Sequence, residues 1–276
     1  PDVRWVGTES GYGRETEWSV VPASTAILDE IAGSSQQSES NGFFKPPGDL
    51  METDLGSREK IKDASALIWY PSEVDVSIRP GWFYHDDQDS LVKSPEKLVD
   101  IYFSSVGRNS VLLLNLPPDR RGLIHENDVK SLRGMRNILD STFKINLAAN
   151  SVINAIPENK SSNPLMVLDE DNKTFWTTNP GETTGMLTLD LDGEQTFDCL
   201  MLQENFRNGQ RVEGFTVEAW KDERWIEIVH GTTIGYKRLM RFSPVNTDKV
   251  RIRITSSRDN PEISTVGIYK LQHEFN

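Results

Sequence analysis

The run Ser110-Val111-Leu112-Leu113-Leu114-Asn115-Leu116 decides the fold class of the first half of this chain of 276 residues. A continuous apolar run of this length is expected of a strand buried on both faces of a parallel sheet. A helical pattern lies on each side of it. Ser94 is a candidate N-cap and Pro95 occupies the first helical position, so the sequence predicts a helix over 95–107.

The second helical pattern covers residues 125–143, with Asn127 as its candidate cap and an apolar stripe along one face. Before the first helix, residues 66–69 and 73–78 have the composition and alternation of strands. Strands alternating with helices predict the last turns of a (β/α)-type barrel. The residues before them do not supply the other strands, so this chain alone is not expected to close an eight-stranded barrel.

The pattern changes after Phe143. Residues 147–276 hold short runs that alternate between apolar and polar residues, separated by Gly, Asn, Asp and Pro. This pattern is typical of an antiparallel β-sandwich. We therefore expect an α/β part over residues 1–145 and an all-β part over residues 146–276.

Composition excludes several classes of protein. Hydrophobic residues make up 36% of the chain and charged residues 26%, and no apolar run is long enough to span a bilayer. The formal net charge of −12 disfavours nucleic acid as a partner, because Lys and Arg must neutralise its phosphates. The single cysteine, Cys199, excludes an intramolecular disulfide, and its apolar neighbours predict a buried thiol.

The segment from Arg4 to Trp18 carries the densest chemistry, with two tryptophans, two arginines and three glutamates interrupted by three glycines. Aromatic rings pack on the apolar face of a sugar, arginine donates to its hydroxyls, and a carboxyl group can transfer a proton. Glu9, Glu15 and Glu17 are all candidates for that proton transfer. Their spacing alone does not choose between them.

Residues Pro1–Glu9 and Arg14–Trp18 resemble the run G-P-D-x-R-W-x-G-N-E-x-G-x-x-R-x-T-E-W of α-L-fucosidases of glycoside hydrolase family 29. The resemblance is to the branch that prefers 1,3- or 1,4-linked fucose, with Thr8 in place of the usual Asn. Residues Trp69–Phe83 and Leu112–Gly122 are similar to late parts of that barrel. The aspartate nucleophile of the family, in a W-F-D-G motif, has no match in this chain.

The resemblance implies a retaining exo-α-L-fucosidase that releases terminal fucose from an oligosaccharide or glycoprotein glycan. It selects Glu9 as the catalytic acid/base, and no cofactor is required for catalysis. A retaining glycosidase needs two carboxyl groups about 5–5.5 Å apart. Without the nucleophile, the chain alone is expected to be inactive. The family also implies an extracytoplasmic location.

Five residues are candidates for substrate binding: Arg4, Trp5, Glu73, Trp82 and His85. For Arg4 the alternative is an ion pair with Asp2 or Glu17, and Trp5 could instead fill the barrel mouth. Glu73, Asp75 and Arg79 share one strand face, where they could contact ligand or form a charge network. The network is the preferred interpretation for Asp75 and Arg79. Under the resemblance, Trp82 would form an aromatic wall beside the fucose methyl group.

The run Leu168–Trp176 resembles a turn of galactose-binding-type (discoidin-like) sandwiches that often wraps calcium, although Glu170 replaces the usual Gly. Asp169, Asp171 and Thr174 would be the ligands of a structural Ca²⁺, because hard cations prefer oxygen donors. The alternative is a turn without metal. For the chain as a whole, the alternative function is a non-catalytic carbohydrate-binding module. Polar loops around Gln203, Arg211 and 235–238 could bind sugar or dock against the first half, and docking is the preferred interpretation.

Overall fold

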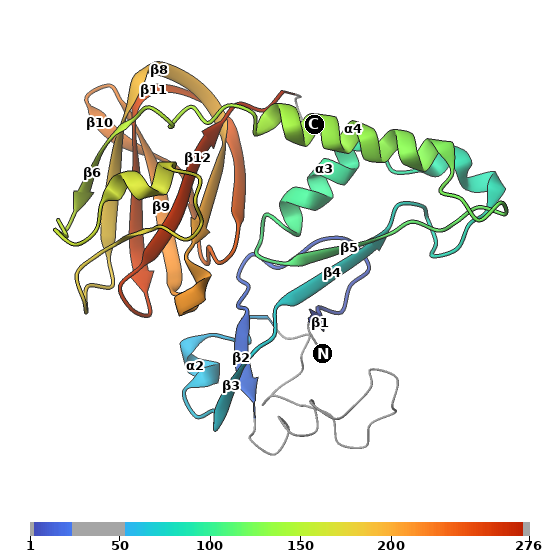
Figure 1. Cartoon of the computed structure of the whole chain (residues 1–276), viewed down its shortest axis with the longest axis horizontal. Helices are drawn as coiled ribbons and strands as arrows, with labels where there is room; N and C mark the ends of the chain where they lie inside the picture. Colours follow the sequence, from blue (N-terminus) through green and yellow to red (C-terminus); the bar gives the residue numbers. More distant parts are fainter. Residues whose placement is uncertain (1–2, 24–52, 273–276) are drawn as a thin grey trace.

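The computed structural model describes residues 3–23 and 53–272, so Pro1 and Asp2 lie outside the described residues. Figure 1 shows two parts joined after one long helix. The first part combines a small sheet with helices, and the second is a β-sandwich.

A parallel sheet organises the described residues of the first part. Its strands are β1 (Arg4–Trp5), β4 (Ser72–Ser77) and β5 (Val111–Asn115), in the order β1-β4-β5. Both pairs are parallel. The prediction of a parallel strand within 110–116 is therefore confirmed. Strands β2 (Val20–Ala23) and β3 (Ala66–Trp69) pair separately and antiparallel, next to the short helix α2 (Arg58–Ile61).

The helices begin where polar side chains cap them. Helix α3 (Pro95–Ser104) starts after Ser94, whose hydroxyl accepts a hydrogen bond from the Lys97 amide at 3.2 Å, as predicted. Helix α4 (Glu126–Thr142) is capped by His125, whose Nδ1 accepts from the Asn127 amide at 3.3 Å. The prediction that Asn127 caps this helix was therefore wrong. Its side chain instead donates to the carbonyl of Asp89, next to the short helix η1 (Asp86–Leu91).

Helices α3 and α4 cover one face of the β1-β4-β5 sheet (Figure 1). Val76 and Ile78 from the region of β4 pack there against Leu98 and Ile101 of α3. The prediction that the 110–116 strand is buried on both faces was wrong within the described residues, since Val111 and Leu113 are each 43% exposed. The apolar run correctly indicates a strand. Burial of both faces of that strand also requires a second layer of structure on the other side of the sheet.

The second part is an antiparallel sandwich, as predicted. Its two long strands, β8 (Gly185–Glu204) and β11 (Arg238–Ser257), pair along most of their lengths and contribute to both layers. One layer adds β6 (Val152–Ile156), β9 (Val212–Lys221) and β10 (Arg224–Gly231). The other adds β7 (Trp176–Thr177) and β12 (Glu262–Tyr269). Two short helices, η2 (Pro164–Leu168) and η3 (Phe206–Asn208), complete the part.

An apolar cluster joins the two parts. Val99, Phe103 and Ile138 from α3 and α4 pack against Cys199, Leu239 and Tyr269 from the sandwich. Cys199 is fully buried, as predicted, and burial raises the pKa of its thiol to about 12. The two parts therefore share hydrophobic core.

A polar junction lies beside this cluster, formed by residues 15–19 and the sandwich loops. Glu15 pairs with Arg108 and with Arg238, and the amide of Glu17 donates to Thr233 Oγ1 at 3.1 Å. The carbonyl of Glu17 accepts from Gln210 Nε2 at 2.8 Å. The Glu17 carboxylate turns inward to a fully buried ion pair with Arg4.

Docking is also the role of the 235–238 loop. The Asn109 amide donates to the carbonyl of Lys237 at 3.1 Å, and the Tyr236 amide donates to Asn109 Oδ1 at 2.8 Å. These contacts bear out the expectation that this polar loop docks against the first half.

Glu204 organises three loops of the sandwich from inside. Its carboxylate accepts from the amides of Arg211, Val212 and Gly235 at 2.8, 2.9 and 2.6 Å. Burial nevertheless dominates and raises the pKa of Glu204 to about 7. The group thus titrates near neutrality while it holds the loops together.

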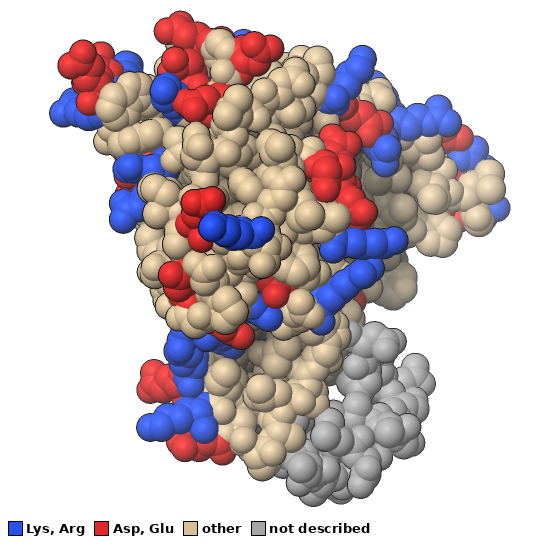
Figure 2. Space-filling view, turned by 60° about the vertical axis from the view of Figure 1, so that its left-hand side comes forward, with Lys and Arg blue, Asp and Glu red and all other residues tan. Residues whose placement is uncertain are grey.

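Acidic and basic side chains are interspersed on the face of the molecule drawn in Figure 2. That face presents no continuous basic stripe of the kind that binds a nucleic acid backbone. Among the described residues, none of the helices combines the length and apolar character that a membrane crossing requires.

Because the pKa of Glu204 is raised in the folded state, we expect the free energy of unfolding to depend on pH. Its pKa rises from the ordinary 4.5 to about 7 on folding, so the folded state keeps a proton that the unfolded chain releases. The resulting stabilisation is complete below pH 4.5 and is lost as the pH rises through 7. It amounts to on the order of 3 kcal/mol. The free energy of unfolding, measured by urea titration across this pH range, should no longer depend on pH in this way in Glu204→Gln. The dependence should persist in Glu59→Gln, a change on the exposed face of α2. An unchanged slope in Glu204→Gln would contradict the assignment.

The Arg4–Glu17 pair predicts a large effect of removing one partner. Arg4→Met leaves the Glu17 carboxylate buried, with the partly exposed Arg14 as its remaining ion-pair partner among the described residues. The free energy of unfolding should fall by about 3 kcal/mol. The double variant Arg4→Met with Glu17→Leu should recover much of this loss. Urea titration followed by tryptophan fluorescence measures both. As a control, Arg136→Ala breaks only an exposed pair with Asp140 and should cost less than about 1 kcal/mol. Equal losses of stability in Arg4→Met and Arg136→Ala would contradict the structural role of the Arg4–Glu17 pair.

Candidate active site

Within the described part of the chain, one face of the β1-β4-β5 sheet is open and carries acidic residues. Along β4, Val74 and Val76 are buried, whereas Glu73 and Asp75 between them are only partly buried. Trp5 of β1 is in register with Glu73 and is 45% exposed. The alternation of a strand therefore separates a core side from an open side that presents carboxylates and an indole.

Glu9 lies at the carboxyl edge of this sheet. It belongs to the loop after β1, and Trp82 belongs to the loop after β4. Because the two strands are parallel, both loops leave the same edge. The Trp82 indole donates to Glu9 Oε2 at 2.7 Å. The structure thus brings together the two residues that the sequence selected as proton donor and aromatic wall.

The loop that carries Glu9 is held at several points. The Gly11 amide donates to the carbonyl of Asp75 at 3.0 Å, and the Arg14 guanidinium donates to the carbonyl of Val6 at 3.1 Å. Gly11 has a φ of +78°, and a Cβ there would come within 2.9 Å of Ile101. Glycine is therefore required for the loop to pass this close to α3.

Asn115 fixes the opposite loop and was missed by the sequence analysis. Its amide donates to Ser77 Oγ and to the carbonyl of Trp82, each at 3.0 Å. Asn115 is the last residue of β5, where a polar residue ends an apolar run. That position, at the edge where the site forms, is the signal that could have identified it.

Trp5 and Asp75 form a second contact on the open face. The Trp5 indole donates to Asp75 Oδ1 at 2.7 Å. Beside them, partial burial and repulsion from Asp75 raise the pKa of Glu73 above its ordinary value. Carboxyl groups whose pKa is raised in an open face are candidates for proton transfer or for binding sugar hydroxyls. Asp75 thus lies with this site and not with the charge network expected for it.

Glu15 and Glu17, the rivals of Glu9, are placed elsewhere. Both take part in the junction with the sandwich, where Glu17 is only 2% exposed and Glu15 pairs with two arginines. Of the three glutamates, Glu9 is the one at the edge of the open face.

Arg4 does not reach the open face, so its prediction as a substrate contact needs correction. Its side chain is fully buried beside Glu17 and also donates to the carbonyls of Tyr70 and Trp18, at 3.1 and 3.0 Å. The geometry is that of the structural ion pair that the sequence left open. A guanidinium without solvent access cannot bind a sugar hydroxyl.

Arg79 forms the buried charge network expected of it. It pairs with Asp128 of α4 at 3.0 Å and with Asp89 of η1 at 2.8 Å. His85 is exposed, and its carbonyl accepts from Arg79 at 3.4 Å. These contacts join His85 to the Arg79 network and not to Glu9, so a substrate role for His85 stays a prediction.

The expected calcium ligands lie together in the turn after η2. Thr174 Oγ1 donates to Asp169 Oδ2 at 2.7 Å, and Asp169 Oδ1 accepts from the Asp171 amide at 2.9 Å. Both oxygens of Asp169 thus already accept hydrogen bonds. In the described part of the chain, no group of three or more His, Cys, Asp or Glu side chains is placed to hold a metal. The turn closes on its own hydrogen bonds, and calcium binding by Asp169, Asp171 and Thr174 stays a prediction.

Comparison with known proteins agrees with this arrangement. Residues 16–142 match the family model of alpha-L-fucosidase, and residues 147–267 match that of the F5/8 type C domain. Alpha-L-fucosidase 1 of Arabidopsis thaliana is 34% identical over 276 residues, which cover 98% of this chain and 50% of that protein. The chain thus spans about half the length of the curated relatives it matches.

Two solved structures are similar over nearly the whole chain. A Bacteroides thetaiotaomicron protein assigned as an alpha-L-fucosidase is 37% identical, with a TM-score of 0.80 over 98% of this chain and 55% of that one. A Ruminococcus gnavus fucosidase of glycoside hydrolase family 29, in complex with fucose, is 29% identical, with a TM-score of 0.81 over 98% of this chain and 51% of that one. The chain therefore contains an alpha-L-fucosidase-like domain followed by an F5/8 type C domain, and it is homologous to the fucosidases of glycoside hydrolase family 29.

Proposed function

We propose that this chain is part of a retaining exo-α-L-fucosidase that releases terminal α-1,3- or α-1,4-linked L-fucose from an oligosaccharide or glycoprotein glycan. The observation that carries the proposal is the Glu9 carboxylate, held by the Trp82 indole at the carboxyl edge of a parallel sheet. In barrel enzymes this edge is where the active site forms. The family match begins at residue 16, so the case for Glu9 rests on this geometry and on the motif around it.

In the proposed mechanism, Glu9 acts twice. An aspartate from outside these 276 residues attacks the anomeric carbon of fucose while the Glu9 carboxyl gives its proton to the departing glycosidic oxygen. The Glu9 carboxylate then takes a proton from water, whose oxygen attacks the same carbon and releases fucose and the aspartate. The configuration at the anomeric carbon is retained after two inversions.

The other residues of the open face would bind the sugar. Trp82 presents its ring beside Glu9, where it can pack on the apolar side of fucose, and Trp5 lies one strand away. Glu73, with its raised pKa, can hydrogen-bond a fucose hydroxyl in either protonation state. Residues 1–145 would form the C-terminal part of a (β/α)₈ barrel. The family resemblance also leads us to propose an extracytoplasmic location.

The 276-residue chain by itself is expected to be inactive. Purified residues 1–276 should not hydrolyse an aryl α-L-fucoside, because double displacement requires a second carboxylate positioned as nucleophile. Release of the aryl alcohol is measured by absorbance, with the product of the whole gene as the positive control. Turnover by the 276-residue chain would show that the nucleophile lies within it.

In the product of the whole gene, the proposed role of Glu9 can be tested by substitution. Glu9→Gln should lower kcat by about 100-fold or more on a natural glycan, because general acid–base catalysis contributes this much. The loss should be smaller on a fucoside whose leaving group needs no protonation. Glu15→Gln is the matched control, since Glu15 pairs with arginines at the junction and should leave kcat unchanged. Equal effects of the two changes would refute the role of Glu9.

A further inference from the structure

The junction between the two parts contains a cavity that the proposed active site does not use. It has a volume of about 270 Å³ and lies between helix α3 and strand β11. Its wall from the first part includes Asp100, Phe103 and Arg108. Its wall from the sandwich includes Arg238 and Arg241. A ligand in this cavity would therefore contact both parts at once.

Arg238 is the most deeply buried charged residue of this cavity, with 3% of its surface exposed. Its two terminal nitrogens donate to the carbonyl and the carboxylate of Glu15, at 2.7 and 2.8 Å. Its Nε is also buried and has no hydrogen-bond partner among the described residues. Burial lowers the pKa of the Arg238 guanidinium, although Glu15 opposes this shift. A buried N–H group without an acceptor is costly, and an oxygen atom in the cavity would satisfy it.

Two more arginines line the cavity nearer to its opening. Arg108 pairs with Glu15, and Arg241 pairs with Asp100 at 2.5 Å and lies over the ring of Phe103. The side chains of Arg108 and Arg241 are 28% and 26% exposed, so the cavity is in contact with solvent on their side. A small ligand can therefore enter while the two parts stay docked.

Cations outnumber carboxylates in this cluster of described residues. Glu15 is shared by two arginines, and Asp100 is shared by Arg241 and Lys97. Four cations thus meet two carboxylates, in a chain whose formal net charge is −12. Because both carboxylates are already paired, the excess positive charge favours an anion over a neutral ligand.

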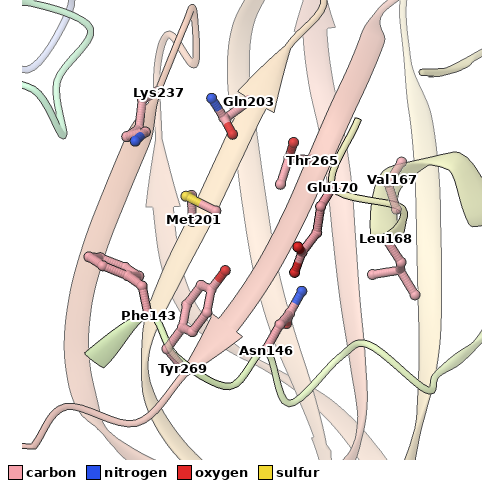
Figure 3. A pocket seen from close by; sticks show the side chains of 10 residues that line it. All are labelled: Phe143, Asn146, Val167, Leu168, Glu170, Met201, Gln203, Lys237, Thr265 and Tyr269. Atoms are coloured by element: carbon pink, nitrogen blue, oxygen red, sulfur yellow. The ribbon is translucent and has the colours of Figure 1, made fainter. Parts of the chain in front are cut away.

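A cavity on the sandwich differs in charge (Figure 3). Its wall carries one carboxylate, that of Glu170, and one ammonium group, that of Lys237. These charges balance, so this cavity has no excess charge to attract an anion. The excess of cations therefore distinguishes the junction cavity, and Lys237 offers a control for it.

We propose that the junction cavity binds a small oxoanion, a phosphate or a carboxylate group, which bridges the two parts. Arg238 would donate from its Nε, and Arg108 and Arg241 would donate to the other oxygens. The planar guanidinium group matches the geometry of both kinds of anion. Leu239 and Met240 would lie beside any apolar portion of the ligand. The bound anion stabilises the docking of the sandwich, and the site does not depend on the hydrolysis proposed above.

The test is a calorimetric titration of the whole 276-residue chain with inorganic phosphate, and separately with malonate. Sodium chloride at the same ionic strength is the reference. Phosphate or malonate should bind saturably at millimolar concentration and raise the unfolding temperature, because a ligand that binds only the folded state stabilises it. Chloride should do neither. The tighter of the two anions identifies the preferred group as phosphate or carboxylate.

Three variants locate the site. Arg238→Lys keeps the charge beside Glu15 and removes the planar guanidinium, so it should bind the anion about 10-fold more weakly. Arg241→Gln removes a donor near the opening and should weaken binding by a similar factor. Lys237→Gln is the matched control, because it removes one positive charge from the other cavity, and it should bind like the parent chain. Thermal unfolding without added anion checks that each variant folds.

Three outcomes would overturn the proposal. In the first, chloride stabilises the chain as well as phosphate and malonate do, since the effect is then general screening. In the second, Lys237→Gln loses binding while Arg241→Gln keeps it, which would place the anion in the other cavity. In the third, neither Arg238→Lys nor Arg241→Gln weakens a saturable binding.

Discussion

The buried ion pair between Arg4 and Glu17 is the interaction on which the arrangement of this molecule depends. Two charges without access to water persist only when each pairs with the other and further hydrogen bonds support them, here from Arg4 to the carbonyls of Tyr70 and Trp18. Arg4 belongs to strand β1 of the first part, and the backbone of Glu17 is hydrogen-bonded to Thr233 and Gln210 of the sandwich. The side chain of Glu17 thus holds strand β1, while the backbone of the same residue holds the second part.

This constraint also shapes the open face. Since residues 15–19 are fixed at the junction and β1 is fixed in the sheet, the intervening loop is anchored at both ends. Further hydrogen bonds to Asp75 and Val6 hold it along its length. Glu9 is therefore carried on a supported segment, in contact with the Trp82 indole, and Asn115 holds the backbone carbonyl of Trp82 from the other side. A catalytic carboxyl group needs such support, because small displacements reduce the efficiency of proton transfer.

Periodicity and capping rules predicted the regular elements well, from residues such as Ser94 and from the alternating runs of the sandwich. They failed where position depends on contacts distant in sequence. The segment from Arg4 to Trp18 is largely irregular, so no period indicates which charges point inward, and Arg4 could not be assigned from sequence. Likewise, the exposure of Val111 depends on what covers the strand. The Glu204 carboxylate likewise joins the amides of Arg211, Val212 and Gly235, which no local pattern connects.

The apolar cluster shared by α3, α4 and the sandwich has a consequence for how such proteins can be recombined. Phe103 and Ile138 on one side and Leu239 and Tyr269 on the other bury each other, so neither part presents a finished surface at their boundary. A chimaera that exchanged the F5/8 type C domain for an unrelated sandwich would leave these side chains facing water. An exchange of this kind therefore requires a donor sandwich that carries a matching hydrophobic patch.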